Sequence, residues 1–134
     1  MLEINDVCKT FNPETPSENQ VFNGLSLNVE EGDFITVIGS NGAGKSTMLN
    51  AIAGVFPIDQ GEILLAGKDL TCLPEHKRAA LIGRVFQDPM LGTSPSMTIE
   101  ENLSLAYSRA NNISLRWGLD FQKRKTFKDY LRNI

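Results

Sequence analysis

The segment whose residue types and spacing most clearly indicate a chemical role runs from Gly39 to Thr47 and reads GSNGAGKST. Within it, Gly39, Gly44, Lys45 and Ser46 match the pattern G-x-x-x-x-G-K-[ST]. In loops of this pattern, successive backbone amides and the positive end of the following helix hold phosphate oxygens. Glycine suits these positions because a Cβ would obstruct the close approach of backbone to phosphate. The pattern therefore predicts a nucleotide-phosphate site.

The residues of this loop have separate predicted roles. Lys45 is expected to contact the β and γ phosphates and to take part in catalysis, and the Ser46 hydroxyl is expected to bind Mg²⁺. ATP and Mg²⁺ are the cofactors that these roles imply. The residues predicted to bind the nucleotide are Gly39, Ser40, Asn41, Gly42, Ala43, Gly44, Lys45, Ser46 and Thr47.

The flanking segments are those needed to position such a loop. Residues 34–38, FITVI, are apolar at nearly every position, which is typical of a strand buried on both faces of a parallel sheet. Residues 46–53 predict a helix with one apolar face, ended by Gly54. Strand, loop and helix therefore follow in the required order, and this context argues against a chance glycine-rich turn.

The remaining sequence predicts further elements. Strands are expected near residues 2–11 and 21–29 with a polar loop at 12–20 between them, which suggests an N-terminal antiparallel sheet. The other predicted elements are strands at 62–66 and 82–86, helices at 74–81 and 98–107, and one or two amphipathic helices within 115–134. Thr98 and Glu101 have capping-box spacing at the start of their helix.

Composition narrows the class of protein. The 134 residues are 41% apolar and 22% charged, which fits one compact domain. A net charge of −3 argues against nucleic acid as a main partner. Cys8 and Cys72 show no metal or redox spacing and are expected to be reduced and buried. The sequence contains neither a signal peptide nor an apolar run of about 18 residues, so we expect a cytoplasmic protein that meets a membrane through another chain.

The order of several motifs resembles the nucleotide-binding subunits of ABC transporters. The motifs are the loop at 39–47, which is a P-loop with a Ser-Thr pair after its lysine, GEILLAGKDL at 61–70, VFQDP at 85–89 and SMTIEENL at 96–103. The resemblance covers about the first 110 residues. It implies an α/β fold: a P-loop NTPase core of the ABC type, with an N-terminal antiparallel β subdomain and the start of a helical subdomain. Residues 1–90 would form the first two parts, and residues 91–134 the third.

The resemblance also implies further site residues. Gln87 looks like the glutamine that reaches Mg²⁺ and the attacking water, and Phe11 looks like the aromatic residue that stacks on adenine. Gln87 could instead be a polar strand terminus, and Phe11 a core aromatic. His76 comes too early to resemble the family's switch histidine, and the basic cluster 123–128 is typical of a solvated helix face or of one that meets acidic lipid headgroups.

Other family motifs do not occur in this sequence. The LSGGQ signature, an uninterrupted Walker B strand ending in Asp-Glu, and a later switch histidine are all missing, so the chain is expected to stop before the signature. We therefore expect little or no ATP hydrolysis by the chain alone, because the residue that would bind the metal and the general base are among the missing groups. The P-loop strand would also lack neighbours on one side, which predicts an exposed part of the core.

The resemblance implies the rest of the functional assignment. The family's ATPase subunits bind ATP between two copies on the inner face of the cell membrane and drive permease subunits, with residues such as Met90, Leu91 and Met97 lining the groove for a permease helix. The residues of these motifs look most like those of bacterial importer subunits, including importers of amino acids. Two alternatives stay open: a nucleotide-binding or interaction module without turnover, and another P-loop enzyme such as a small-molecule kinase.

Overall fold

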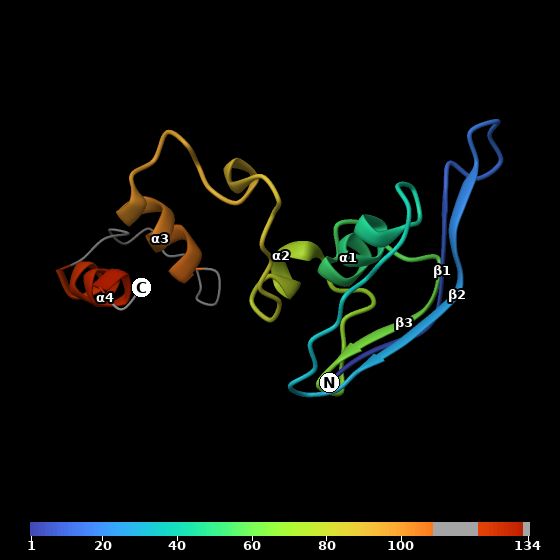
Figure 1. Cartoon of the computed structure of the whole chain (residues 1–134), viewed down its shortest axis with the longest axis horizontal. Coiled ribbons are helices and arrows are strands. Elements are labelled where there is room, and N and C mark those ends of the chain that lie inside the picture. The colour runs from blue at the N-terminus through green and yellow to red at the C-terminus, as the bar shows by residue number, and fades with distance from the viewer. Residues whose placement is uncertain (109–120, 133–134) are drawn as a thin grey trace. The chain divides into compact units, whose positions relative to one another are not determined.

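The chain forms two compact units in a computed structural model that describes residues 1–108 and 121–132 (Figure 1). The first unit is Met1–Arg78 and the second is Ala79–Ile134. The functional division predicted near residue 90 stays a prediction.

The first unit contains a four-stranded antiparallel sheet in the order β2-β1-β3-β4. Its strands are β1 (Leu2–Phe11), β2 (Asn19–Val29), β3 (Gln60–Leu65) and β4 (Lys68–Asp69). Ile4 of the central strand β1 is paired with Leu27 on one side and with Ile63 on the other. Ile4 and Ile63 are buried, as the alternating apolar pattern requires. The predicted antiparallel sheet is confirmed.

Two helices complete the first unit. Helix α1 (Lys45–Ala53) follows the glycine loop, as predicted, and lies beside the sheet in Figure 1. It ends at Gly54, whose left-handed backbone (φ 78°) lets its N–H donate to the Ala51 carbonyl. Helix α2 (Glu75–Arg78) is shorter than the helix predicted at 74–81.

Residues 34–38 do not form the predicted buried strand. They belong to no strand of the described sheet, and the side chains of Phe34 and Ile38 are 95% and 89% exposed. A strand of a parallel sheet needs hydrogen-bonded neighbours and apolar cover on both faces. The strands of the first unit pair only with one another in the described chain, so the segment has neither. The expectation of an exposed apolar region beside the P-loop is confirmed.

The prediction of a strand at 82–86 is wrong for the same reason, the lack of a neighbouring strand. These residues have no regular secondary structure, and Val85 is 98% exposed. An apolar pattern can indicate that a segment suits a strand, but strand formation also requires a partner edge. The described part of the second unit contains helices only: η1 (Pro89–Leu91), α3 (Ile99–Ser108) and α4 (Phe121–Arg132).

Helices α3 and α4 pack against each other in the second unit. Tyr107 and Phe127 make an edge-to-face contact with ring centroids 5.9 Å apart, and Phe127 is buried. At the start of α3, the Thr98 N–H donates to Glu101 Oε2 (2.7 Å), and the Glu101 N–H donates to Thr98 Oγ1 (3.3 Å). The predicted capping box is therefore confirmed. Residues 115–120 and 133–134 of the predicted amphipathic tail lie outside the described residues.

The cysteines are free, as expected, but they are not buried. Cys8 is half-buried, and Cys72 is exposed in the turn after β4. Across residues 1–108 and 121–132, no helix is both long and apolar enough to cross a membrane.

Candidate functional site

The glycine loop turns sharply into the first turn of α1. The Ala43 N–H donates to the Ser40 carbonyl (3.2 Å), and Gly42 and Gly44 have left-handed backbones with φ of 85° and 83°. The Met48 N–H then donates to the Gly44 carbonyl (2.8 Å), which starts the helical hydrogen-bond pattern. A loop of this form aims the free amides at the helix start outward, as an anion site requires.

Strand β2 supports the loop from behind. A Cβ placed on Gly44 would lie 3.0 Å from Val21 Cγ1 and 3.3 Å from Phe22 Cε1. Gly44 is buried and Phe22 is 7% exposed, so the backbone of the loop is packed directly against side chains of the sheet. Gly44 is therefore needed for close packing against β2 as well as for its backbone geometry.

The Lys45 side chain folds back over the start of the loop. Its ammonium donates to the carbonyl oxygens of Gly39 and Ser40, both at 2.7 Å. Ser46 and Thr47 follow in the first turn of α1, with Ser46 exposed and Thr47 half-buried, and Asn41 is exposed in the turn. The structure therefore brings the loop residues predicted to bind nucleotide into one turn that carries the Lys45 cation and is exposed at residues 39–43 and at Ser46.

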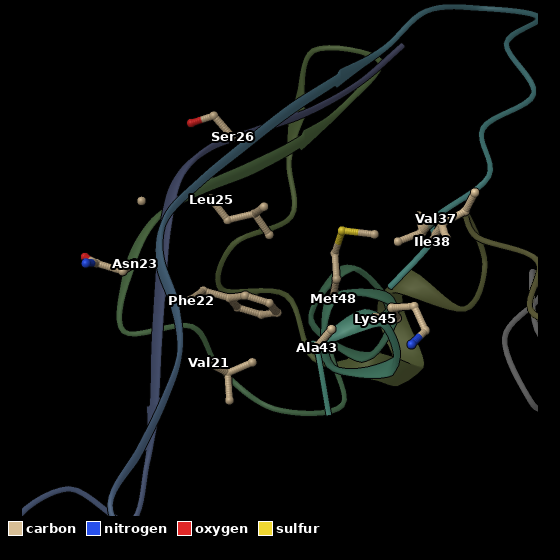
Figure 2. A pocket seen from close by; sticks show the side chains of 12 residues that line it. Val21, Phe22, Asn23, Leu25, Ser26, Val37, Ile38, Ala43, Lys45 and Met48 are labelled. Atoms are coloured by element: carbon tan, nitrogen blue, oxygen red, sulfur yellow. The ribbon is translucent and has the colours of Figure 1, made fainter. Parts of the chain in front are cut away.

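A hollow of about 560 Å³ lies between β2 and the loop. Figure 2 shows Phe22 and Leu25 of β2 facing Met48 of α1 across it, whereas Asn23 lies on the opposite side of the strand. Polar and apolar surface both contribute to its lining, and the Lys45 ammonium lies on the far side of the helix start from β2 (Figure 2). Because Phe22, Leu25 and Met48 face one another across this hollow, away from that ammonium, we place the anion site at the loop backbone instead.

Phe11, the predicted base-stacking residue, lies at the end of β1 in the same unit. Its ring makes an edge-to-face contact with Phe56, with centroids 5.1 Å apart, and is half-exposed. The Lys9 ammonium lies 5.4 Å from the Phe11 centroid and 5.7 Å from the Phe56 centroid. Phe11 is thus held in a small aromatic and cationic cluster.

Asp59 connects this cluster to the segment after α1. Its Oδ1 lies 2.7 Å from Lys9 Nζ, and its Oδ2 accepts from the Thr10 N–H (2.6 Å). The hydrogen bond from Lys9 and that from Thr10 lower the pKa of the Asp59 carboxyl below its ordinary value. The sequence indicated neither Asp59 nor Lys9, because the two residues are 50 positions apart. Lys9 is one of several polar residues in β1, so no local signal distinguishes it.

Arg78 is a second feature that sequence reasoning missed. The residue is 2% exposed, and its guanidinium donates to the carbonyls of Ala51 and Ile52 (both 2.9 Å), Leu73 (2.7 Å) and Thr71 (3.0 Å). Burial lowers the pKa of Arg78, and the charge of Asp69 opposes that effect. The side chain therefore closes the C-terminal end of the helix that begins at the P-loop.

Gln87 belongs to the second unit, with an exposed side chain just before η1. The same unit contains a hollow of about 660 Å³ whose lining includes Leu91, Met97, Ile99 and Leu103. Two of the residues predicted to line a permease groove, Leu91 and Met97, are among its walls. Met90 is exposed and lies outside that lining.

Comparison with known proteins decides the family. The family model described as "ABC transporter" matches residues 22–134, which is most of the chain. The chain belongs to the ABC transporter family. The resemblance noted in the sequence is therefore confirmed.

The curated relatives of this chain include ATP-binding proteins that are named for transport. A "Tyrosine transport ATP-binding protein" of Clostridioides difficile is 46% identical over 116 residues, which are 87% of this chain and 46% of the relative. A "Spermidine/putrescine import ATP-binding protein PotA" of Bacteroides fragilis is 36% identical over 104 residues, which are 78% of this chain and 21% of the relative. The chain thus spans about half the length of the first of these relatives and about a fifth of the second.

Solved ABC cassettes share the fold of this chain. A dimeric cassette in a post-hydrolysis state bound to ADP and Pi has a TM-score of 0.76 and 26% identity, covering 98% of this chain and 56% of that one. A nucleotide-free cassette from an ABC transporter has a TM-score of 0.73 and 28% identity, with 98% and 54% covered. The predicted α/β fold class, an ABC-type P-loop cassette with an N-terminal antiparallel sheet, is confirmed.

Proposed function

We propose that the chain binds ATP-Mg through residues 39–47 as part of the ATPase subunit that powers a membrane ABC transporter. The observation that carries the proposal is the Lys45 ammonium, held by two loop carbonyls at the start of α1. A cation and the free amides of a helix N-terminus together form a site for a polyphosphate. Membership of the ABC transporter family supports ATP as the nucleotide.

The residues of the chain fit the groups of ATP-Mg in specific ways. The loop backbone and Lys45 would hold the phosphates, the exposed Ser46 hydroxyl would bind Mg²⁺, and the half-exposed face of Phe11 would stack on adenine. Gln87 would contact Mg²⁺ and the attacking water. Bound Mg²⁺ supplies neutralisation of the charge that develops on the phosphates.

We further propose little or no hydrolysis by the chain alone. The sequence contains no match to the signature or to the Walker B Asp-Glu pair, and phosphoryl transfer to water depends on such groups. In the complete assembly, ATP would lie between two ATPase subunits, and the dimeric form of a solved cassette supports this arrangement. The assembly would lie on the cytoplasmic face of the membrane.

The apolar hollow of the second unit is proposed as the contact for a permease helix. Its walls include Leu91, Met97 and Ile99, and an amphipathic helix buries its apolar face in a groove of this kind. The name of the import protein from Bacteroides fragilis supports an importer, and the more similar relative, from Clostridioides difficile, is named for tyrosine transport. We therefore propose that the subunit serves an amino acid importer.

Binding of a fluorescent ATP analogue tests the proposed site. We expect saturable, Mg²⁺-dependent binding that Lys45→Ala abolishes and that Lys68→Ala, a control at an exposed lysine of β4, leaves unchanged. Phosphate release on the same samples should stay at background. Binding that survives in Lys45→Ala would overturn the site, whereas steady Lys45-dependent hydrolysis would favour another P-loop enzyme over the ABC chemistry. Binding without turnover in the full assembly would favour a non-hydrolysing module.

A further inference from the structure

We infer that Asp59 and Lys9 are positioning residues that hold the Phe11 ring in place for the nucleobase. The inference rests on the proposed function, because it assumes that Phe11 stacks on adenine. It adds two charged side chains, one on β1 and one after α1, that are not expected to touch the nucleotide. Their joint effect is to fix the end of β1 relative to the helix of the P-loop.

Asp59 joins the two segments through three hydrogen bonds. Its carboxylate accepts from Lys9 Nζ (2.7 Å) and from the Thr10 N–H (2.6 Å), and its own N–H donates to the Cys8 carbonyl (3.0 Å). Three consecutive residues of β1 are thus bound by one residue that lies only five positions beyond Gly54, the end of α1. Phe11 is the next residue along the strand.

Lys9 extends this connection to the aromatic rings. The side chain is 11% exposed, so its ammonium is largely removed from water and is compensated by Asp59. The ammonium lies within 6 Å of both the Phe11 and the Phe56 centroids, a distance at which a cation attracts the face of an aromatic ring. Neutralising Asp59 would leave the Lys9 charge buried without its partner, so Lys9 would be driven toward solvent and away from the rings.

Phe11 needs such support because of its place in the chain. It is the last residue of β1, and the following residues 12–18 form an exposed loop. A ring at a strand end has rotamers to lose when a base stacks on it, and immobilising a side chain opposes binding. The Phe56 edge contact and the Lys9 ammonium restrict the ring beforehand, so less freedom remains to be lost on binding.

The effect should be confined to the base. The phosphate site depends on the loop at 39–47 and on Lys45, whose ammonium donates to the carbonyls of Gly39 and Ser40, outside this cluster. ATP uses both the base and the phosphate contacts, whereas inorganic tripolyphosphate uses the phosphate contacts alone. The ratio of the two affinities therefore separates loss of base positioning from general damage to the fold.

The test is calorimetric titration of the whole chain with Mg-ATP and with Mg-tripolyphosphate. We expect Asp59→Asn to weaken ATP binding by about two- to tenfold, the range for immobilising one side chain, with tripolyphosphate affinity unchanged. Lys9→Met should act in the same way, and Asp59→Glu should restore part of the loss. Asp69→Asn is the matched control, since this aspartate also accepts a backbone hydrogen bond, from the Thr71 N–H, but lies on β4, which β3 separates from β1.

Phe11→Ala completes the design, with an expected loss of about tenfold or more in ATP affinity from removal of base stacking. Adding Asp59→Asn to Phe11→Ala should then cause no further loss. If Phe11→Ala is selective for ATP but Asp59→Asn is not, the positioning role is wrong and the proposed function stands. If Phe11→Ala changes neither affinity, both the stacking and the positioning roles are wrong. Equal losses for ATP and tripolyphosphate in Asp59→Asn would show a purely structural role and overturn the inference.

Discussion

The guanidinium of Arg78 lies 2.9 Å from the carbonyl oxygen of Ala51, 27 residues earlier in the chain. The bond connects the last residue of α2 to the final turn of α1, the helix that begins at the P-loop. Ile52 and Leu73 provide further carbonyl partners for the same side chain. The C-terminal end of α1 is therefore fixed by one buried cation.

Replacing Arg78 should destabilise the first unit. Arg78→Met removes the donor from buried carbonyls and should lower the free energy of unfolding by at least about 1–3 kcal/mol, the penalty for one buried acceptor left unpaired. Lys77→Met, at an exposed position of the same helix, is the matched control and should stay near the wild-type value. Urea unfolding followed by circular dichroism measures both. Equal stability of the two variants would contradict this structural role.

The two left-handed glycines of the P-loop should respond differently to alanine. Gly42→Ala meets open space and should cost about 1–2 kcal/mol from its positive φ alone. Gly44→Ala has the same backbone cost and also brings a Cβ within 3.0 Å of Val21, so overpacking should add about 1–3 kcal/mol. Thermal unfolding of the two variants measures the difference. A smaller loss for Gly44→Ala than for Gly42→Ala would show that β2 does not support the loop.

The contribution of Asp59 to stability should depend on pH. Its pKa in the folded chain is lowered from 3.8, first by the hydrogen bond from Lys9 and then by that from Thr10. A lowered carboxyl pKa stabilises the fold above the unfolded-state pKa, and this contribution is lost as pH falls through the folded-state pKa. Urea midpoints of wild type and Asp59→Asn should therefore differ at pH 7 and converge as pH falls below 3.8. A gap that widens in acid would reverse the assigned sign.

The capping box of α3 gives a prediction in the second unit. Thr98→Ala removes the hydroxyl that accepts from the Glu101 N–H, so hydrogen exchange in the first turn of α3 should accelerate by about fivefold, a typical N-cap effect. Thr98→Ser keeps the hydroxyl and should exchange like wild type. Exchange at α1 serves as an internal reference. An unchanged rate in Thr98→Ala would mean that the cap does not limit fraying of this helix.

Local patterns explain what the sequence could predict. The loop at 39–47, the helix after it and the Thr98 capping box each depend on residues a few positions apart, so spacing alone indicates them. The prediction of a buried strand at 34–38 is wrong because such a strand depends on neighbours that no local pattern specifies. Lys9 with Asp59, and Arg78 with Ala51, are contacts across 50 and 27 residues that only the fold creates.

The hydrogen bonds from Lys45 to the Gly39 and Ser40 carbonyls have a further consequence for the proposed nucleotide site. A phosphate that approaches this ammonium must exchange places with carbonyl oxygens of the same loop. The apparent dissociation constant is then the intrinsic constant divided by the fraction of molecules whose lysine has left those carbonyls. A loop whose own carbonyls bind its cation would therefore discriminate against anions with a single acceptor atom, which replace both bonds poorly, in favour of polyphosphates with many acceptor oxygens.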